Sequence, residues 1–205
     1  MKVSIIGAGN MARGIGARVL AGGNDLELVA RDGAAAQALA DELGGGTVSG
    51  SASGDVVVLA IPYGAAADVV AEHGDELRGK VLVDISNPLD WSTMDSLVTP
   101  EGSSAAEEIA KLLPDGPPVV KAFNTNFAAT LSSGQVAGEP LDVLLAGDDA
   151  DAKEKVASFV EAGGLRSRDV GPLKRARQLE QLGFLHITAQ EPMGSGWGSA
   201  IKINW

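Results

Sequence analysis

A glycine-rich segment, Gly7-Ala-Gly-Asn-Met-Ala12, has the residue types and spacing that most directly indicate chemistry. It follows the β-branched run 2–6 and precedes a stretch with apolar residues at intervals of four. In such a segment the first glycine permits a tight strand-to-helix turn, the second lets the backbone approach a pyrophosphate, and the final alanine allows close helix packing. The N-terminus of a helix also favours anions. The segment therefore predicts a dinucleotide site at Gly7, Ala8, Gly9, Asn10 and Met11, the alternative being a turn without a ligand.

The end of the next predicted strand, 26–30, indicates which dinucleotide binds. An NAD site places an acidic residue there to bind the ribose 2′-hydroxyl, whereas this strand ends in Ala30 and Arg31. A guanidinium group is planar and permanently charged, which suits a 2′-phosphate. We therefore expect NADP(H), with Ala30 and Arg31 beside that phosphate. The alternative is that Arg31 is solvated and Asp32 takes the acid's role one position later.

The remaining sequence predicts no catalytic side chain and no metal site. The two histidines, His73 and His186, fall in predicted helices without metal-ligand spacing, and we expect a solvated His73 and a packed or interfacial His186. Serine-hydrolase, zinc-protease and phosphate-loop motifs are missing, and the absence of cysteine excludes thiol chemistry. Direct hydride transfer remains open, because it needs two rings held together and no proton shuttle.

Apolar runs and helical patterns alternate along the chain and define the elements that must position these residues. Strands are predicted at 2–7, 26–30, 56–61, 80–85, 119–123, 141–146 and 168–170, and helices at 11–19, 34–43, 64–77, 104–113, 150–161 and 173–190. Ser104 and Glu107 have the spacing of a capping box at the start of the helix over 104–113. This alternation predicts the α/β class, with a Rossmann-type doubly wound parallel sheet and helices on both faces. We expect one dinucleotide-binding domain over 1–205, in which 171–205 is a small C-terminal helical extension. Its helix and Gly-rich tail would complete the site or a dimer interface.

Composition excludes several classes of protein. The 205 residues include 27 acidic and 16 basic side chains, and a net charge of -11 argues against nucleic-acid or anionic-membrane binding. No segment approaches the roughly 20 apolar residues of a membrane span, and Met1 leads directly into a strand pattern. We therefore expect a cytoplasmic protein. Two segments are locally basic: 1–31 carries +2, and 166–177 carries +4 and either attracts an anionic co-substrate or forms a solvated or interfacial helix.

Motifs along essentially the whole chain occur in a familiar order. They lie at 5–12, 60–62, 84–88, 121–125, 146–149, 171–173, 179–180 and 201–202. Together they resemble the NADPH:coenzyme F420 oxidoreductases, or F420-dependent NADP reductases. The domain is also similar to the NADPH-binding part of membrane metalloreductases and the front half of pyrroline-5-carboxylate reductases. The resemblance implies an NADP-dependent oxidoreductase that passes hydride between NADP(H) and the deazaflavin coenzyme F420. The alternatives are another acceptor (flavin, quinone or ferric chelate) and a non-catalytic NADP-binding sensor.

The resemblance also implies roles for individual residues and a homodimer formed through the C-terminal helix. Those implied at the nicotinamide half are Ile61, Pro62 and Ala128, and those at the second ring are Asn87, Pro88, Asn124, Thr125 and Trp197. The sequence departs from the family at Ala30, where serine is frequent, at Ala34 and Ala35, where a basic residue is found, and at Asn124, where archaeal members have histidine. For Asn87 and Asn124 the alternative is local hydrogen bonding within turns.

Overall fold

The structure, a computed structural model, describes residues 1–204; Trp205, the last residue of the predicted tail, lies outside the described residues. Its main sheet has eight strands in the order β10-β9-β6-β5-β4-β1-β2-β3. The strands are β1 (Lys2–Ile6), β2 (Asp25–Val29), β3 (Thr47–Ser49), β4 (Val56–Leu59), β5 (Val81–Asp84), β6 (Val119–Lys121), β9 (Asp142–Gly147) and β10 (Arg166–Asp169). The chain proceeds outward from β1 to β3 and then returns to the other side of β1 at β4. The crevice between β1 and β4 is therefore the switch point where ligands bind in such sheets.

The Rossmann-type α/β fold is confirmed, with one departure from a strictly parallel sheet. Strand β9 runs antiparallel to β6, with Val120 opposite Gly147 and Lys121 opposite Ala146. The connection between them holds α5 (Ala128–Ser133) and a hairpin of β7 (Gln135–Val136) and β8 (Glu139–Pro140). Antiparallel neighbours need no crossover of the sheet. Strand β9 therefore begins beyond the carboxyl end of β6 and runs back beside it.

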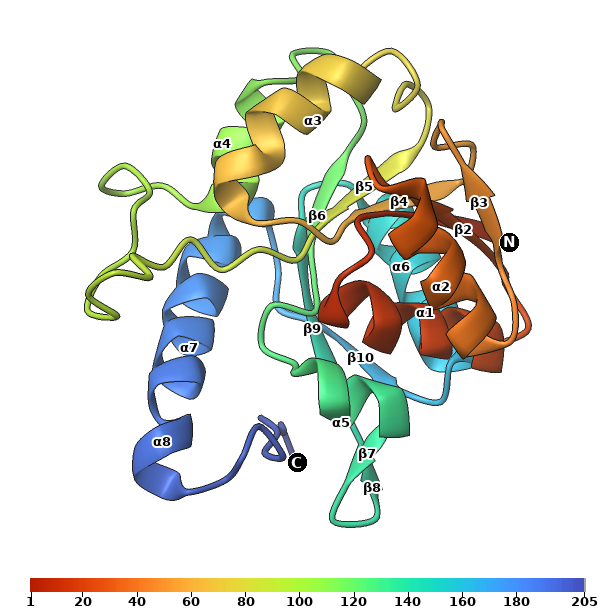
Figure 1. Cartoon of the computed structure of the whole chain (residues 1–205). Coiled ribbons are helices and arrows are strands. Elements are labelled where there is room, and N and C mark those ends of the chain that lie inside the picture. Colours follow the sequence, from red (N-terminus) through yellow and green to blue (C-terminus); the bar gives the residue numbers. More distant parts are fainter. Residues whose placement is uncertain (205) are drawn as a thin grey trace.

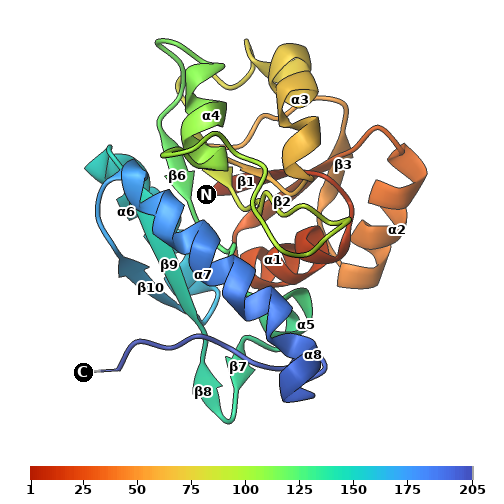
Figure 2. The same cartoon turned by 90° about the vertical axis from the view of Figure 1, so that its left-hand side faces the viewer.

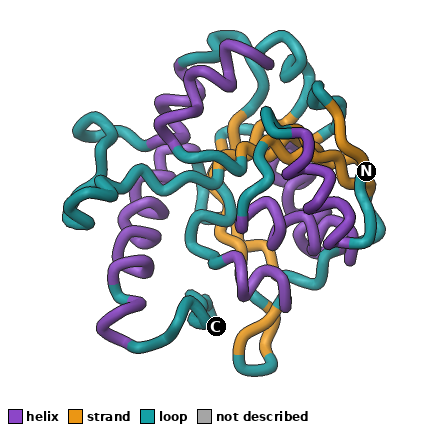
Figure 3. Tube along the Cα trace, in the orientation of Figure 1, coloured by secondary structure: helices purple, strands orange, loops and turns teal. Residues whose placement is uncertain are grey.

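Helices cover both faces of the sheet, as predicted (Figure 1, Figure 3). Beside α5 they are α1 (Asn10–Ala21), α2 (Gly33–Leu43), α3 (Ala66–His73), α4 (Ala105–Lys111), α6 (Ala150–Ala162), α7 (Ala176–Thr188) and α8 (Gln190–Met193), with 3-10 turns η1 (Tyr63–Ala65) and η2 (Leu173–Arg175). One core cluster joins the sheet to α1, α2 and α6, and the other joins it to α3, α4 and the start of α7. Figure 2 shows α7 running obliquely across the face of the sheet near β9.

The apolar run in β4 shows how the sequence builds these two layers. All four residues of β4 are buried, and successive side chains of a strand point to opposite faces. Val56 and Val58 join the cluster with α1, α2 and α6, whereas Val57 and Leu59 join the cluster with α3 and α4. A strand covered on both faces needs an uninterrupted apolar run, and this is the pattern from which it was predicted.

The predicted ends of several helices agree with the structure. The Ser104 hydroxyl accepts a hydrogen bond from the backbone N–H of Glu107 at 3.2 Å, so the N-cap that the capping-box spacing predicted at the start of α4 is confirmed. The Glu107 carboxylate accepts from the Ser104 hydroxyl at 2.8 Å. The long helix predicted over 173–190 is divided into η2, α7 and α8. The short elements β3, α5, β7 and β8 were not predicted, since segments of two to six residues carry too few apolar positions to show a period.

The carboxylate of Glu27 in β2 is buried and gives the fold a dependence on pH. It accepts hydrogen bonds from Lys2 Nζ at 2.5 Å, from Ser53 N at 2.7 Å, and from the hydroxyls of Ser4 and Ser53. Burial by itself raises the pKa of Glu27, but these hydrogen bonds outweigh it and lower the pKa from 4.5 to about 2. The folded state therefore binds this proton less readily than the unfolded state does.

We expect Glu27 to contribute roughly 2–3 kcal/mol of stability above pH 4.5, lost as the pH falls towards about 2. Glu27→Gln should lower the free energy of unfolding at neutral pH and flatten its rise with pH across this window, as measured by urea denaturation. Glu42→Gln, which removes an exposed carboxylate paired with Arg13, is the control with little effect. Parallel pH curves for wild type and Glu27→Gln would contradict the assignment.

Candidate functional site

An apolar cleft of about 380 Å³ opens beside the N-terminus of α1, at the carboxyl ends of the central strands. Its lining comes from the segments after β1, β4, β5 and β6 and from the C-terminal part of the chain: Gly9, Asn10, Met11, Ala60, Ile61, Pro62, Tyr63, Ile85, Ser86, Asn87, Trp91, Phe123, Asn124, Asn126, Phe127, Ile187 and Trp197. A second cleft of about 430 Å³ is lined in part by Gly7, Ala30 and Arg31. Because Ile61 lines both, the two clefts are neighbours at the switch point.

The glycine-rich turn has the geometry expected of a close backbone approach. Gly7 has φ +124°, and a Cβ there would lie 2.3 Å from the carbonyl oxygen of Ala60, so no larger residue fits. Nothing lies within 4 Å of the Cβ position of Gly9, which precedes α1 and has no side chain to cap it. The first backbone N–H groups of α1 therefore lie beside open space, where a ligand can reach them.

The end of β2 gives Arg31 and Asp32 different surroundings. Arg31 is exposed and lines the second cleft. Asp32 instead caps α2, since its Oδ1 accepts hydrogen bonds from the N–H groups of Ala34 at 3.0 Å and Ala35 at 3.1 Å. The carboxylate considered as an alternative ribose ligand thus has a structural role in the helix. Arg31 supplies the positive charge in the lining of the second cleft, which also includes Glu72.

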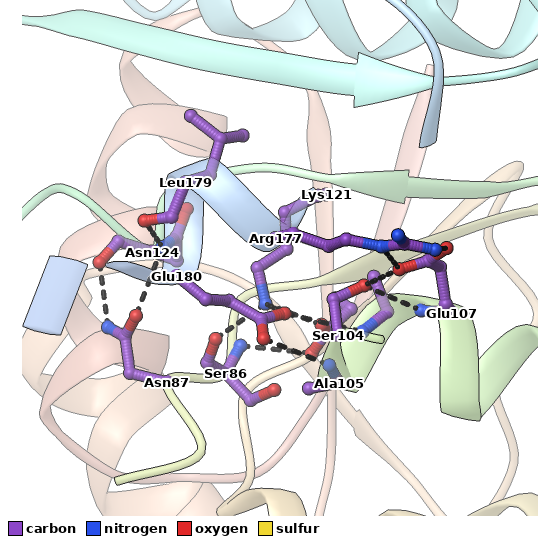
Figure 4. Close-up of polar contacts among 12 residues, drawn as sticks. Ser86, Asn87, Ser104, Ala105, Glu107, Lys121, Asn124, Arg177, Leu179 and Glu180 are labelled. Carbon is purple, nitrogen blue, oxygen red and sulfur yellow. Dashed lines mark hydrogen bonds and ion pairs between the residues drawn. The ribbon is translucent and has the colours of Figure 1, made fainter. Parts of the chain in front are cut away.

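Asn87 and Asn124 lie side by side and connect two loops of the cleft to α7 (Figure 4). Asn87 Nδ2 donates to the carbonyl oxygen of Asn124 at 2.7 Å, and Asn124 Nδ2 donates to Asn87 Oδ1 at 3.0 Å and to the carbonyl oxygen of Leu179 at 2.8 Å. These partners are 37 and 55 residues away along the chain. The alternative of local turn bonding is therefore wrong for these side chains.

Three buried oxygens of the cleft-lining residues have no hydrogen-bond partner anywhere in residues 1–204: Ser86 Oγ, Asn124 Oδ1 and Asn126 Oδ1. A buried polar atom left unpaired costs about 1–3 kcal/mol. Ser86 and Asn126 were not predicted as site residues, although they stand one position before Asn87 and two positions after Asn124. The signal that could have identified them is the run of polar residues at the ends of two adjacent buried strands.

Aromatic side chains form the far wall of the cleft. The rings of Phe127 and Trp197 meet edge to face at a centroid distance of 5.0 Å, and Phe127 lies 4.3 Å from the His186 ring. Trp197 has φ +66° and follows Gly196 at φ +58°, and the predicted Gly-rich tail places this residue in the lining of the cleft. Four other aromatic residues of the lining, Tyr63, Trp91, Phe123 and Phe127, were not predicted, because single rings outside long helices and strands have no informative spacing.

His186 is packed in the interior, as predicted. Its Nδ1 lies 3.2 Å from the carbonyl oxygen of Thr125 and its Nε2 lies 2.8 Å from the Ser199 hydroxyl. Burial lowers the pKa of His186 despite the bond to Thr125, so the ring is neutral at neutral pH. The carbonyl can only accept, which places the proton on Nδ1 and leaves Nε2 to accept from Ser199. This ring supports the wall and ties the C-terminal tail to α7.

Four predicted residues lie beside the first cleft and outside its lining: Ala8, Pro88, Thr125 and Ala128. Pro88 and Thr125 are buried, and Thr125 contributes its carbonyl to His186. Ala128 opens α5 and packs on α1, since a Cβ on Gly14 would lie 2.8 Å from the Ala128 carbonyl oxygen. The structure therefore assembles the other predicted residues around the two clefts and places these four behind them.

A buried ionic cluster, which the sequence did not predict, lies beneath the cleft (Figure 4). Lys121 Nζ donates to Asp84 Oδ2 at 2.7 Å, to Glu180 Oε1 at 2.8 Å and to the carbonyl oxygen of Ser86 at 2.6 Å. Glu180 also accepts from the N–H of Ala105 at 3.0 Å, at the N-terminus of α4. Burial lowers the pKa of Lys121, but the two carboxylates outweigh it and raise the pKa above its usual value. Burial raises the pKa of Glu180.

The predicted exposure of His73 is wrong. Its ring is buried under the second cleft, and Nδ1 lies 3.1 Å from Glu76 Oε2. A helix pattern with apolar Val69 and Val70 on the same turn could have placed it inside.

Within the described part of the chain, no group of three or more His, Cys, Asp or Glu side chains is arranged to hold a metal ion. None of the helices in residues 1–204 combines the length and apolar composition that a bilayer span needs.

The basic cluster 166–177 is used largely in ion pairs away from the cleft. Arg166 Nε lies 2.6 Å from Asp142 Oδ1, and Arg177 pairs with both oxygens of Glu107 at 2.6 and 2.8 Å. No residue of this cluster lines the first cleft. Of the two interpretations of this basic cluster, the structure therefore favours a solvated or interfacial surface over a site that attracts an anionic co-substrate.

A doubly wound sheet with a glycine-rich turn at its switch point defines the dinucleotide-binding α/β proteins. Comparison with known proteins narrows this class. Residues 2–88 match the family model described as NADP oxidoreductase, coenzyme F420-dependent. The F420-dependent NADP reductase of Methanothermobacter thermautotrophicus is 31% identical over 202 residues, covering 89% of this chain and 86% of that protein. The chain belongs to the F420-dependent NADP reductase family and is thereby an NADP-dependent oxidoreductase.

The chain is also similar to a second reductase of known structure and to part of a metalloreductase. A crystal structure from Arthrobacter sp. FB24, provisionally named an F420-dependent NADP reductase, superposes with a TM-score of 0.87 at 27% identity and covers 100% of both chains. Metalloreductase STEAP3 of Rattus norvegicus is 32% identical over 183 residues, but the chain spans only 36% of its length. The family resemblance read from the motifs is therefore confirmed.

Proposed function

We propose that the protein transfers a hydride directly between NADP(H) and the deazaflavin coenzyme F420. The observation that carries this proposal is one apolar cleft that extends from the N-terminus of α1 to α7 and Trp197. Hydride transfer needs two rings held together away from water, and the cleft offers apolar walls beyond the dinucleotide-binding turn.

In this proposal the dinucleotide occupies both clefts. The N–H groups around Gly7–Met11 bind the pyrophosphate, because a helix N-terminus with open space beside it is an anion site. Ala30 and Arg31 bind the 2′-phosphate in the second cleft, and Ile61 and Pro62 border the nicotinamide, with Ala128 behind them at the start of α5. NADPH, when bound, supplies the hydride.

The acceptor ring lies next to the nicotinamide in this proposal, with Asn87, Asn124 and Trp197 around it and the buried Pro88 and Thr125 behind them. Asn87 and Asn124 hold each other and α7 in place, while the Trp197–Phe127 wall excludes water. Reduction of the deazaflavin takes up one hydride and one proton, and the proton comes from solvent because no acid is positioned by these residues. In this proposal the described residues that line the cleft contribute orientation and a dry site.

The test is to mix the purified protein with NADPH and oxidised coenzyme F420 and to follow the absorbance of the deazaflavin. Bleaching at a rate proportional to enzyme concentration is expected. If NADPH binds tightly and no bleaching occurs, this acceptor is wrong. The same assay with a flavin, a quinone or a ferric chelate then separates another acceptor from a non-catalytic sensor. The ferric chelate is included because of the similarity to the metalloreductase.

The assignment of Arg31 predicts a change in cofactor preference. Arg31→Ala should raise KM for NADP by a factor that corresponds to about 1.5–3 kcal/mol, the value of a charged hydrogen bond, and change NAD kinetics little. Arg78→Ala is the matched control, since Arg78 is exposed and lies outside both clefts. Steady-state kinetics measures both. If NADP and NAD weaken equally, Arg31 does not contact the 2′-phosphate.

We also propose a cytoplasmic homodimer. Leu185 and Met193 expose large apolar side chains on α7 and α8, which supports contact between two copies at the C-terminal helices. Sedimentation equilibrium tests this proposal. If the protein sediments at micromolar concentration as a single species with the 20.8 kDa mass of one chain, the proposed homodimer is wrong.

A further inference from the structure

We propose that Ser86, Asn124 and Asn126 form a polar floor that binds the amide or imide edge of a ring. This inference rests on the proposed function, in which the first cleft holds two rings. It adds the chemical group that the cleft recognises: an N–H donor beside a carbonyl. The starting observation is that Ser86 Oγ, Asn124 Oδ1 and Asn126 Oδ1 are buried and unpartnered in residues that line one cleft.

The orientation of both amides is fixed by the protein. Asn124 Nδ2 donates to the carbonyl oxygen of Leu179 at 2.8 Å, and Asn126 Nδ2 donates to the carbonyl oxygen of Asp142 at 2.9 Å. A carbonyl can only accept, so a flipped amide would place two acceptors against each other. In each side chain the oxygen is therefore the atom left over, and it can only accept.

Ser86 is held in place independently of its hydroxyl. Its N–H donates to Asp84 Oδ1 at 2.9 Å and its carbonyl accepts from Lys121 Nζ at 2.6 Å, whereas its Oγ has no partner in the described residues. The three residues are only 7%, 3% and 5% exposed, and the three oxygens are themselves buried. A hydrogen bond made here is shielded from water and is correspondingly strong.

These donor and acceptor properties select a class of ligand. The two amide oxygens require N–H or O–H donors, and the Ser86 hydroxyl can donate to an adjacent carbonyl. The nicotinamide carboxamide and the imide edge of a flavin or deazaflavin each offer a carbonyl next to an N–H. A quinone offers only carbonyl acceptors, and a ferric carboxylate chelate offers acceptors that are also anionic. The floor therefore favours a ring with an imide over these other acceptors.

Two pairs of ligands test the proposal and distinguish the two sources of the N–H. NADP is compared with its 3-acetylpyridine analogue, in which a methyl group replaces the amide nitrogen. Oxidised 5-deazariboflavin is compared with its N3-methyl derivative. Binding is measured by fluorescence titration, since Trp91 and Trp197 line the cleft. The wild type should bind the N–H member of at least one pair about 5- to 100-fold more tightly, and the pair that shows this identifies the source.

Variants separate recognition from folding. Asn126→Leu should bring the ratio of affinities within a discriminating pair close to one, a readout that a purely structural role would not move. Ser86→Ala should weaken the favoured ligand several-fold and leave the melting temperature unchanged or higher, because the hydroxyl bonds nothing in the described protein. Ser4→Ala is the matched control. Its buried hydroxyl accepts from Gly54 N at 2.8 Å, so it should lose stability and keep the ratio.

The outcomes distinguish this inference from the proposed function. Equal affinities within both pairs, or an unchanged ratio in Asn126→Leu, would overturn the polar floor even if coenzyme F420 is turned over. Suppose instead that the wild type prefers the N–H ligand, that Asn126→Leu loses this preference, and that coenzyme F420 is not turned over. The polar floor would then be supported, and coenzyme F420 would be the wrong acceptor. A melting temperature that falls as far in Ser86→Ala as in Ser4→Ala would give the Ser86 hydroxyl a structural role and overturn its part in recognition.

Discussion

Replacing Lys121 with methionine should lower the free energy of unfolding by about 3–5 kcal/mol. Methionine fills a similar volume but leaves Asp84 and Glu180, whose side chains are each 1% exposed, as carboxylates without a counter-ion. It also leaves the carbonyl of Ser86 without its donor. Urea denaturation measures the loss, and the same variant should bind NADP more weakly because the Ser86–Asn87 segment of the cleft is no longer held.

The matched control removes the whole charge cluster and keeps its shape. In Asp84→Asn/Lys121→Met/Glu180→Gln no buried charge is left unpaired, so most of the lost stability should return, as expected when a buried ion pair is replaced as a unit. If Lys121→Met alone changes stability by less than about 1 kcal/mol, or if the triple variant is as unstable as the single one, the loss does not arise from uncompensated charge.

The sequence predicted those features that depend on local patterns. The fingerprint at Gly7–Ala12, the apolar β4 and the capping box at Ser104 each follow from residues within one turn or strand. The cleft at the switch point follows in turn from the order of strands, which short right-handed connections largely determine. The glycine-rich turn could therefore be predicted from the residues themselves, whereas the roles of Ile61 and of the residues after β5 and β6 were implied by the family resemblance.

The features that were missed depend on contacts between distant segments. Lys121 meets partners 37 and 59 residues away, and a lysine in a three-residue strand has no sequence signal for complete burial. The unpaired oxygens of Ser86 and Asn126 can be recognised only when every neighbouring donor is known. The polarity of His73 favours solvent, but its position on the buried face of α3, with Val69 and Val70, places it inside. Packing decides such cases, and local propensity does not.

Gly183→Ala should lower kcat/KM of the proposed hydride transfer by about 100-fold, the cost of displacing a site by roughly 1 Å. Glycine in a helix is ordinarily a weakness, and alanine would be expected to stabilise α7 by about 0.5–1 kcal/mol. Here the added Cβ would lie 2.4 Å from Asn87 Oδ1 and 2.9 Å from Asn124 Nδ2. Either α7 or the asparagine pair must move, and both are tied to the cleft through the bond from Asn124 to Leu179.

Gly33→Ala is the matched control, since Gly33 begins α2 and nothing lies within 4 Å of its Cβ position. It should keep full activity and be slightly more stable, which isolates helix propensity from steric overlap. Gly183→Ala should instead lose stability in urea denaturation together with activity and NADP affinity, because the overlap occurs at the wall of the cleft. Full activity in Gly183→Ala would show that α7 can shift without disturbing Asn87 and Asn124. The close approach of α7 would then be a feature of packing alone, and the proposed acceptor site would not depend on it.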